Sequence, residues 1–233
     1  MKGLFIGINY IGTENELSGC VNDVKTIIEL YKKTYRLTDV RLLTDYDELN
    51  LPTRRNILEN VKWLVTNNMK GDQLFFHYSG HGSSVLDKNK DEKDGFDECI
   101  IPLDYSSSGV IVDDELKELM VKQVGDAHLF SVIDACHSGT MLDLPYSYLC
   151  NEKVIVANEN TETYNVVLLS GCKDNQTSAD TIEKINGQYI NCGALTWALC
   201  NVIGDNGGIS FINLIKEIRN ILATSKYTQI PQL

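Results

Sequence analysis

The chain has 233 residues, of which 43% are hydrophobic and 23% charged, and its formal net charge is −11. This length and composition suit a single α/β domain, which we expect to span residues 1–233. The negative charge argues against nucleic acid as a partner, because phosphates require a basic surface. Uncharged apolar runs are no longer than a strand, so the sequence predicts no association through a membrane span.

Seven cysteines are scattered along the chain without the spacing of a disulfide framework or of a CxxC zinc site. The first ten residues hold one lysine and an apolar stretch too short for a secretion signal, so this stretch is interpreted as a first buried strand. These features together predict reduced thiols and a cytoplasmic protein.

Segments of strand length alternate with segments of helical periodicity along the chain. Strands are predicted at residues 4–9, 40–43, 74–78, 129–134 and 166–170. Helices are predicted at residues 17–33, 53–66, 113–121, 196–202 and 211–222. The alternation predicts a mostly parallel central sheet with helices on both faces. Two polar stretches, residues 83–95 and 146–163, are predicted to be loops with a function or a cleavage site.

Two apolar runs each end in a glycine-containing turn that carries a reactive residue. Residues 76–82 read Phe-His-Tyr-Ser-Gly-His-Gly and contain His81, and residues 133–139 read Ile-Asp-Ala-Cys-His-Ser-Gly and contain Cys136. Strands that end in such turns present side chains at the carboxyl edge of a sheet. A cysteine and a histidine there can act as thiolate nucleophile and base, and the amides of Gly82 and Cys136 can hold an oxyanion. The pair predicts a cysteine peptidase.

Two other residues near these turns are alternatives for the same roles. His77 is an alternative base, but its place within the strand favours a packed core residue. Cys172 follows another apolar run and is the alternative nucleophile, although we interpret it as part of a pocket wall.

Acidic residues near the same turns suggest a specificity pocket. Asp134 shares a strand face with Cys136, because side chains two apart point the same way. It could orient His81, or it could form the floor of a pocket for a basic side chain. Asp23, near the start of the first predicted helix, favours the pocket, since two carboxylates together would select Arg or Lys.

At these motifs the chain resembles the metacaspases, a family of caspase-like cysteine peptidases. The resemblance runs from residue 3 to the end and is carried by residues 78–82, 94–98, 134–140, 142–146, 170–180 and 229–233. The 55 residues between His81 and Cys136 agree with the roughly 50 expected in caspase-like chains. The short linker resembles the type I arrangement, with a large-subunit-like part at 1–145, a linker loop at 146–164 and a small-subunit-like part at 165–233.

The resemblance implies a caspase-like fold and an endopeptidase that cleaves protein or peptide substrates after Arg or Lys. It makes His81 and Cys136 the catalytic dyad. It also assigns four residues to the pocket for the basic side chain, namely Cys20, Asp23, Ser79 and Asp134.

The resemblance further implies activation by Ca²⁺, bound by four aspartates. By spacing these are Asp97, Asp113, Asp114 and Asp143, with Asp94 as the alternative to Asp97. Carboxylate oxygens are hard ligands that suit Ca²⁺.

We also expect self-processing and a monomeric enzyme. Lys153 is the only basic residue of the 146–163 stretch, so cleavage after it is the specific prediction. Three other interpretations remain: a non-catalytic caspase-like regulatory protein that binds partners, a peptidase for acidic residues, and a different cysteine hydrolase such as an amidase.

Overall fold

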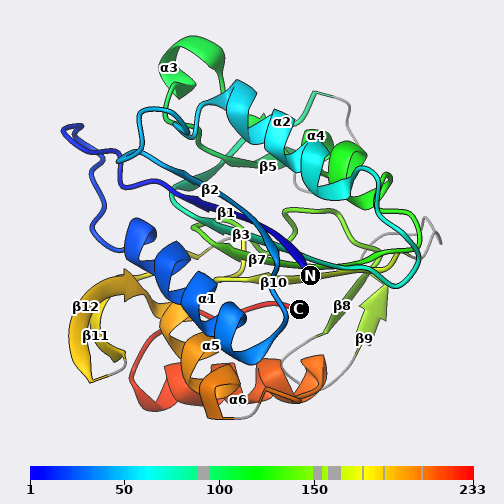
Figure 1. Ribbon diagram of the computed structural model, residues 1–233. Helices are drawn as coiled ribbons and strands as arrows, with labels where there is room; N and C mark the ends of the chain where they lie inside the picture. Colours follow the sequence, from blue (N-terminus) through cyan, green and yellow to red (C-terminus); the bar gives the residue numbers. More distant parts are fainter. Residues whose placement is uncertain (89–94, 149–153, 157–163, 175, 186, 206) are drawn as a thin grey trace.

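The computed structural model describes residues 1–88, 95–148, 154–156, 164–174, 176–185, 187–205 and 207–233. Its centre is a five-stranded sheet in which every neighbouring pair is parallel, in the order β10-β7-β3-β1-β2 (Figure 1). These strands are β1 (Lys2–Gly7), β2 (Asp39–Thr44), β3 (Gln73–Ser79), β7 (His128–Asp134) and β10 (Val166–Ser170). The predicted parallel sheet is confirmed.

Helices cover both faces of this sheet, as predicted (Figure 1). One face carries α1 (Cys20–Thr34), α5 (Ala194–Asp205) and α6 (Phe211–Thr224), and the other carries α2 (Arg54–Val65), α4 (Asp113–Leu116) and η1 (Lys117–Val121), with the short α3 (Tyr105–Ser108) beyond. Successive side chains of β3 point to opposite faces of the sheet and so enter two hydrophobic cores. Phe75 packs with the first group of helices and Phe76 with the second.

Local sequence explains where two of these helices begin. The Thr53 hydroxyl accepts the Asn56 amide at 3.3 Å ahead of α2, and the Ser210 hydroxyl accepts the Asn213 amide at 3.4 Å ahead of α6. The helix predicted at residues 113–121 instead has two parts, because a π-helical turn, η1, follows the four residues of α4.

Several antiparallel strands were not predicted. They are β4 (Gly82–Leu86), β5 (Phe96–Ile100) and β6 (Ile111–Val112) in one small sheet, β8 (Tyr146–Tyr148) with β9 (Val154–Val156), and β11 (Asp180–Ile185) with β12 (Gln188–Gly193). The predicted loops 83–95 and 146–163 therefore contain strand residues, which corrects the prediction. Short ribbons such as these depend on pairing with a partner strand, which a local pattern does not reveal.

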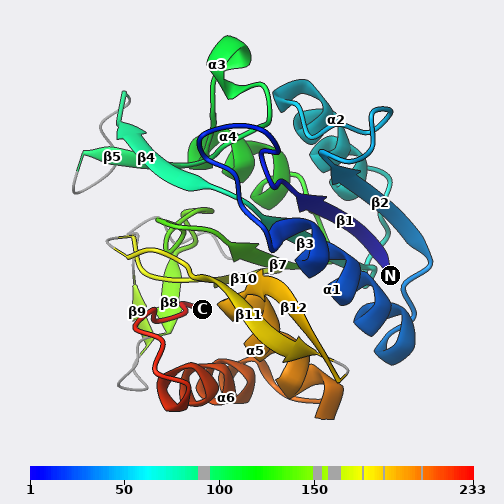
Figure 2. The same cartoon turned by 90° about the vertical axis from the view of Figure 1, so that its left-hand side faces the viewer.

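The small antiparallel elements lie on different sides of the central sheet, with β11–β12 on the left and β8–β9 on the right of the view in Figure 1. The β11–β12 hairpin packs against α1 and α5 (Figure 2). The outer edge of β10 meets the end of the chain, where Ser170 and Gln232 exchange backbone hydrogen bonds of 3.1 and 3.2 Å. Among the helices of the described residues, none has the length and hydropathy to cross a membrane.

Candidate active site

The ends of β3 and β7 lie side by side at the carboxyl edge of the sheet. Ser79, the last residue of β3, is in register with Asp134, the last residue of β7. Beyond the paired strands, the Gly80 amide donates to the Asp134 carbonyl oxygen at 3.4 Å. The turns that carry His81 and Cys136 therefore leave neighbouring strands at the same edge.

The two turns touch at Gly82. A Cβ atom added there would overlap the carbonyl oxygen of Cys136 and would lie 3.1 Å from the Cβ atom of Ala135. Only glycine permits this approach, so the residue after His81 packs directly against the backbone of the candidate nucleophile.

The imidazole of His81 is held by two residues that precede α1. Its Nε2 lies 2.7 Å from the Asn15 carbonyl oxygen. A carbonyl oxygen can only accept, so this contact requires a proton on Nε2 and leaves Nδ1 as the acceptor. The ring also packs on Tyr10, with ring centroids 4.6 Å apart. The Tyr10 hydroxyl accepts the His81 amide at 3.1 Å.

Cys136 is half-buried, and its Sγ lies 3.9 Å from the Ser178 carbonyl oxygen. Burial raises the pKa of the Cys136 thiol, so a base must remove its proton before it can attack. Cys172, the alternative nucleophile, is fully buried, with its Sγ 3.2 Å from the Gln176 carbonyl oxygen. Burial raises the pKa of that thiol to about 11. Accessibility therefore favours Cys136.

Two other histidines, His77 and His137, are held by packing or by hydrogen bonds away from the reactive position. His77 is fully buried, and burial lowers its pKa to about 3, so it stays neutral. Its Nε2 lies 3.4 Å from the Thr196 hydroxyl, in the core where the sequence analysis put it. His137 follows Cys136 with a positive φ of 51°, and its Nδ1 contacts the Asp174 carbonyl oxygen.

Asp23 lies in the first turn of α1 and is 1% exposed. Its Oδ2 accepts the Ser79 hydroxyl at 2.7 Å, and its Oδ1 accepts the Gly193 amide at 2.9 Å. Burial raises the pKa of Asp23 well above its usual range, and the nearby charge of Asp134 raises it further.

Asp134 is also buried, with 5% of its surface exposed. Its Oδ1 accepts the Ser178 hydroxyl at 2.6 Å, and its Oδ2 accepts both the amide and the hydroxyl of Thr196 at 2.9 Å. Burial raises the pKa of Asp134, and these hydrogen bonds oppose the rise because they favour the charged form.

Gly193, the last residue of β12, separates the two carboxylates. A Cβ atom added at Gly193 would overlap Asp134 Oδ2 and would lie 3.0 Å from Asp23 Oδ2. A side chain at this position would therefore occupy the space between the acids. The predicted pocket residues Asp23, Ser79 and Asp134 meet at one place in the fold.

Cys20, the fourth predicted pocket residue, begins α1 and is also buried. Its pKa is raised well above the usual range by burial, and then by the charge of Asp23. The thiol is consequently a neutral group beside the acid pair. All four pocket residues named from the sequence lie in this buried cluster.

The sequence did not predict several residues of the candidate site. They are Tyr10 and Asn15 beside His81, and Ser178, Thr196 and Gly193 beside the two acids. Ser178 belongs to the 170–180 segment, which is one of the segments that carry the family resemblance, so the sequence did point to this part of the chain. Thr196 and Gly193 carry no such signal, because they reach the acids only when α5 and β12 pack against the sheet edge.

The four aspartates assigned to calcium have different surroundings. Asp113 and Asp143 are neighbours: burial raises the pKa of Asp113 to about 9, and the charge of Asp143 is the next cause. Asp113 Oδ1 accepts the Asp114 amide at 2.9 Å, and Asp97 is buried on β5. Within the described ranges, no three acidic, histidine or cysteine side chains are arranged to hold a metal ion.

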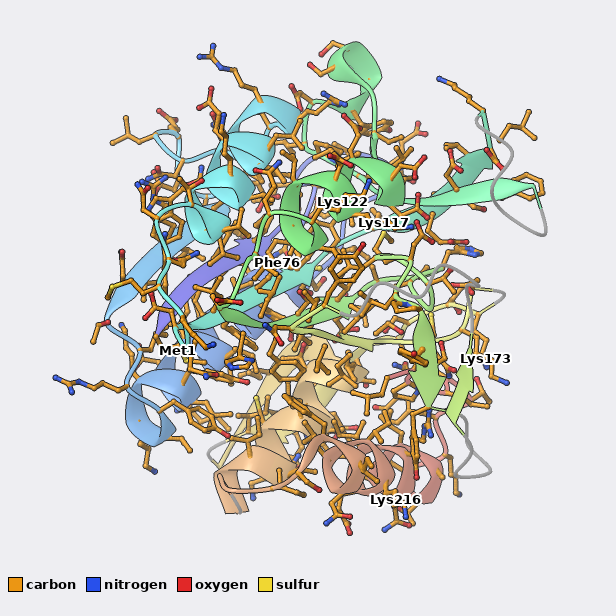
Figure 3. All side chains as sticks on the ribbon, turned by 90° about the vertical axis from the view of Figure 1, so that its right-hand side faces the viewer. Met1, Phe76, Lys117, Lys122, Lys173 and Lys216 are labelled. Carbon is orange, nitrogen blue, oxygen red and sulfur yellow. The ribbon has the colours of Figure 1, made fainter. Side chains whose placement is uncertain are left out.

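A lysine accompanies this second acid group. The Lys117 amine on η1, which is labelled in Figure 3, lies 3.7 Å from Asp143 Oδ2. Both side chains are largely buried. Glu98 links the group to the turn after Cys136, since its amide donates to Asp113 Oδ2 at 2.9 Å and its Oε2 accepts the Thr140 hydroxyl at 2.7 Å. Asp94 and Lys153, the alternative ligand and the processing position, lie outside the described residues.

Comparison with known proteins agrees with this architecture. A crystal structure of a Geobacter sulfurreducens protein superposes with a TM-score of 0.69 over 99% of this chain and 90% of that one, at 24% sequence identity. That likeness supports the fold.

Sequence comparison identifies the family. A family model described as metacaspase, peptidase C14 domain, matches residues 1–145. The whole chain is 38% identical to Metacaspase-1 of Schizosaccharomyces pombe and covers 66% of it. It is also 38% identical to Metacaspase-5 of Trypanosoma cruzi, of which it covers 57%, and to Metacaspase-3 of Trypanosoma brucei brucei, of which it covers 70%. The chain spans about two thirds or less of the length of several of these relatives. Its matches to the family model and to these relatives show that the chain belongs to the metacaspase family.

Proposed function

We propose that the chain is a cysteine endopeptidase that cleaves after Arg or Lys. One observation carries this proposal: the Cys136 turn packs against the His81 turn on one side and adjoins a buried pair of carboxylates on the other. A nucleophile, a base and a site for a basic side chain are the parts that such a reaction requires.

In the proposed reaction His81 Nδ1 takes the proton from Cys136 Sγ, and the thiolate attacks the carbonyl carbon of the scissile bond. The Asn15 carbonyl oxygen keeps the Nε2 proton in place and so fixes the reactive tautomer. Amides of Gly82 and Cys136 would hold the oxyanion. Collapse of the intermediate transfers the proton from His81 to the leaving amine and forms a thioester, which water then hydrolyses to restore the thiol.

The acid pair supports the preference for Arg or Lys. Asp23 and Asp134 are buried and receive hydrogen bonds from hydroxyl and amide groups, and within the described part of the chain no cation forms an ion pair with either. A guanidinium or ammonium group entering beside Gly193 would supply the balancing charge. An acidic side chain there would instead add a third carboxyl group to a pair that already repels itself, so the preference for acidic residues is disfavoured.

Hydrolysis of fluorogenic peptides that end in Arg, Lys or Asp tests the proposal, with wild type and the Cys136→Ala variant compared. We expect turnover after Arg and Lys that the variant loses. Binding of the arginyl peptide by folded wild-type protein without turnover would favour the regulatory interpretation, and turnover only of small amides would favour an amidase.

We also propose that Ca²⁺ activates the enzyme. Asp113 and Asp143 fit a hard cation best, because two buried carboxylates repel each other, and Asp97 and Asp114 are the further candidates. Bound Ca²⁺ would supply positive charge that relieves this repulsion. We expect calcium to raise both the activity and the melting temperature, and a chelator to reverse both. Identical activity and melting with calcium and with chelator would contradict the assignment.

Self-processing after Lys153 belongs to the same proposal. We expect incubation of wild type to yield two fragments whose masses correspond to cleavage after Lys153, and the Lys153→Ala variant to remain intact. An unchanged cleavage site in that variant would refute the assignment. We further propose a monomer, since Gln232 pairs with Ser170, the last residue of the edge strand β10. Light scattering after gel filtration measures this directly.

A further inference from the structure

The end of the chain is fastened to the segment that connects β10 with β11. The Thr228 carbonyl oxygen accepts Gln176 Nε2 at 2.9 Å, and the Ile230 amide donates to Gln176 Oε1 at 3.1 Å. Residues 171–174 and 176–179, which we call the pocket loop, also supply Ser178 beside Asp134. The C-terminal residues 228–232 and the pocket loop therefore form one hydrogen-bonded unit.

Gln229 is the centre of this unit and is 5% exposed. Its Nε2 donates to the Gly171 carbonyl oxygen at 2.9 Å and to the Ser178 hydroxyl oxygen at 3.2 Å. Its Oε1 accepts the Ala179 amide at 2.9 Å. Both donors and one acceptor of the carboxamide are engaged, each with a different residue of the pocket loop.

Ser178 carries the effect of Gln229 to the candidate active site. Its hydroxyl accepts from Gln229 and donates to Asp134 Oδ1 at 2.6 Å, which is consistent with one continuous direction of hydrogen bonding. The carbonyl oxygen of the same residue lies 3.9 Å from Cys136 Sγ. One residue of the pocket loop therefore contacts both the pocket acid and the nucleophile.

We propose that Gln229 is a positioning residue of the active site, which sets Ser178 against Asp134 and Cys136 through its side-chain amide. The proposal rests on the proposed function, because Asp134 and Cys136 are the groups that it serves. It assigns a role in substrate binding to a residue that is 93 positions from the nucleophile in the sequence.

The chemistry of the contacts requires an amide at this position. In a Gln229→Glu variant, an ionised carboxylate would direct an oxygen at the Gly171 carbonyl oxygen and at the Ser178 hydroxyl oxygen, where donors are needed. The Ser178 proton would then turn toward the new carboxylate and away from Asp134. A protonated carboxyl group has the shape of the amide and restores one donor, so acid conditions should rescue the variant in part.

The test compares Gln229→Glu with Gln232→Glu, a matched control whose Nε2 donates only to the Ile230 and Pro231 carbonyl oxygens in the C-terminal residues themselves. With an arginyl peptide we expect Gln229→Glu to raise KM about tenfold at neutral pH, the effect of one lost hydrogen bond to a charged group. The control should change KM less than about twofold, and the excess in KM should shrink as the pH falls. Thermal melting verifies that both variants are folded.

A second variant tests the route through Ser178. Ser178→Ala should raise KM by a similar factor, and the double variant with Gln229→Glu should be no worse than the more impaired single variant, since both changes break the same chain of contacts. If the double variant raises KM by the product of the two single factors, Gln229 acts independently of Ser178 and the proposal is overturned. An unchanged KM in folded Gln229→Glu would overturn it as well.

The rate at which iodoacetamide alkylates Cys136, followed by mass spectrometry, separates this inference from the proposed function. We expect faster alkylation in Gln229→Glu than in wild type and Gln232→Glu, because the Ser178 carbonyl oxygen would no longer cover Sγ. If wild type cleaves no peptide but this difference appears, the proposed function fails and the positioning role stands. If wild type cleaves arginyl peptides and the alkylation rates and KM values are equal, the positioning role fails alone.

Discussion

The part of the chain that the structure describes includes two pairs of aspartates with largely buried side chains, and the two pairs are supported differently. Asp23 and Asp134 receive hydroxyl and amide hydrogen bonds, and among the described residues no cation forms an ion pair with either. In the second pair, Asp143 lies 3.7 Å from the Lys117 amine. Neutral donors can hold a carboxylate in place without cancelling its charge, whereas a lysine cancels part of it.

This difference indicates different tasks for the same residue type. The first pair is fixed in geometry and, among the described residues, forms no ion pair with a cation, which suits a site that receives a basic side chain from a substrate. The second pair has the Lys117 amine beside it, so this part of the protein can stay folded without a bound metal ion. A metal there would add to a partly balanced group, which suits a regulatory ion better than a permanent structural one.

The largest effect is expected where charge is removed from the first pair. Asp134→Asn keeps the shape of the side chain but removes the charge that would meet the substrate cation, so kcat/KM for an arginyl peptide should fall about 100-fold or more. Asp126→Asn, an exposed change in the turn before β7, is the control. If kcat/KM falls less than threefold in Asp134→Asn, the acid pair does not bind the basic side chain of the substrate.

A smaller effect is expected when the second pair loses its lysine. Lys117→Met keeps most of the buried apolar stem but removes the amine that lies 3.7 Å from Asp143, so the free energy of unfolding should fall by about 1–2 kcal/mol in chelator. Calcium should recover most of this loss. Lys32→Met, which breaks an exposed pair with Glu29, should cost less than about 0.5 kcal/mol. Equal losses in both variants, measured by denaturant unfolding, would contradict the distinction between buried and exposed pairs.

The smallest effect is a pH dependence that the first pair should impose on KM. The pKa of Asp23 is raised, so protonation competes with a basic substrate side chain, and KM for an arginyl peptide should fall as the pH rises through that pKa. A raised pKa also means that the folded state holds a proton that the unfolded chain has released. Stability from this group is therefore present at low pH and is lost as the pH rises from the usual Asp range through the raised pKa. Asp23→Asn should flatten both profiles, and unchanged slopes in the variant would assign them to other groups.

The central sheet and the placement of the His81 and Cys136 turns at one edge of it could be predicted because both depend on local patterns. Apolar runs that end in Gly80 and in Gly139 mark strands and their turns, and parallel strands bring such turns to one edge. The antiparallel ribbons could not be predicted in the same way. Residues 82–86, for example, form a strand because 96–100 pair with them, and that pairing is not visible in either segment alone.

The sequence by itself determined the family, the parallel sheet and the residue types of the candidate site, because these are encoded in short motifs and in the period of apolar residues. Only the tertiary structure decided which neutral groups surround the acids. Ser178, Gly193 and Thr196 lie 44 to 62 positions from Asp134 along the chain, yet they determine its hydrogen bonds and the space beside it. The physical reason is that burial and hydrogen bonding set the charge state of a carboxylate, and both arise only when distant segments pack together.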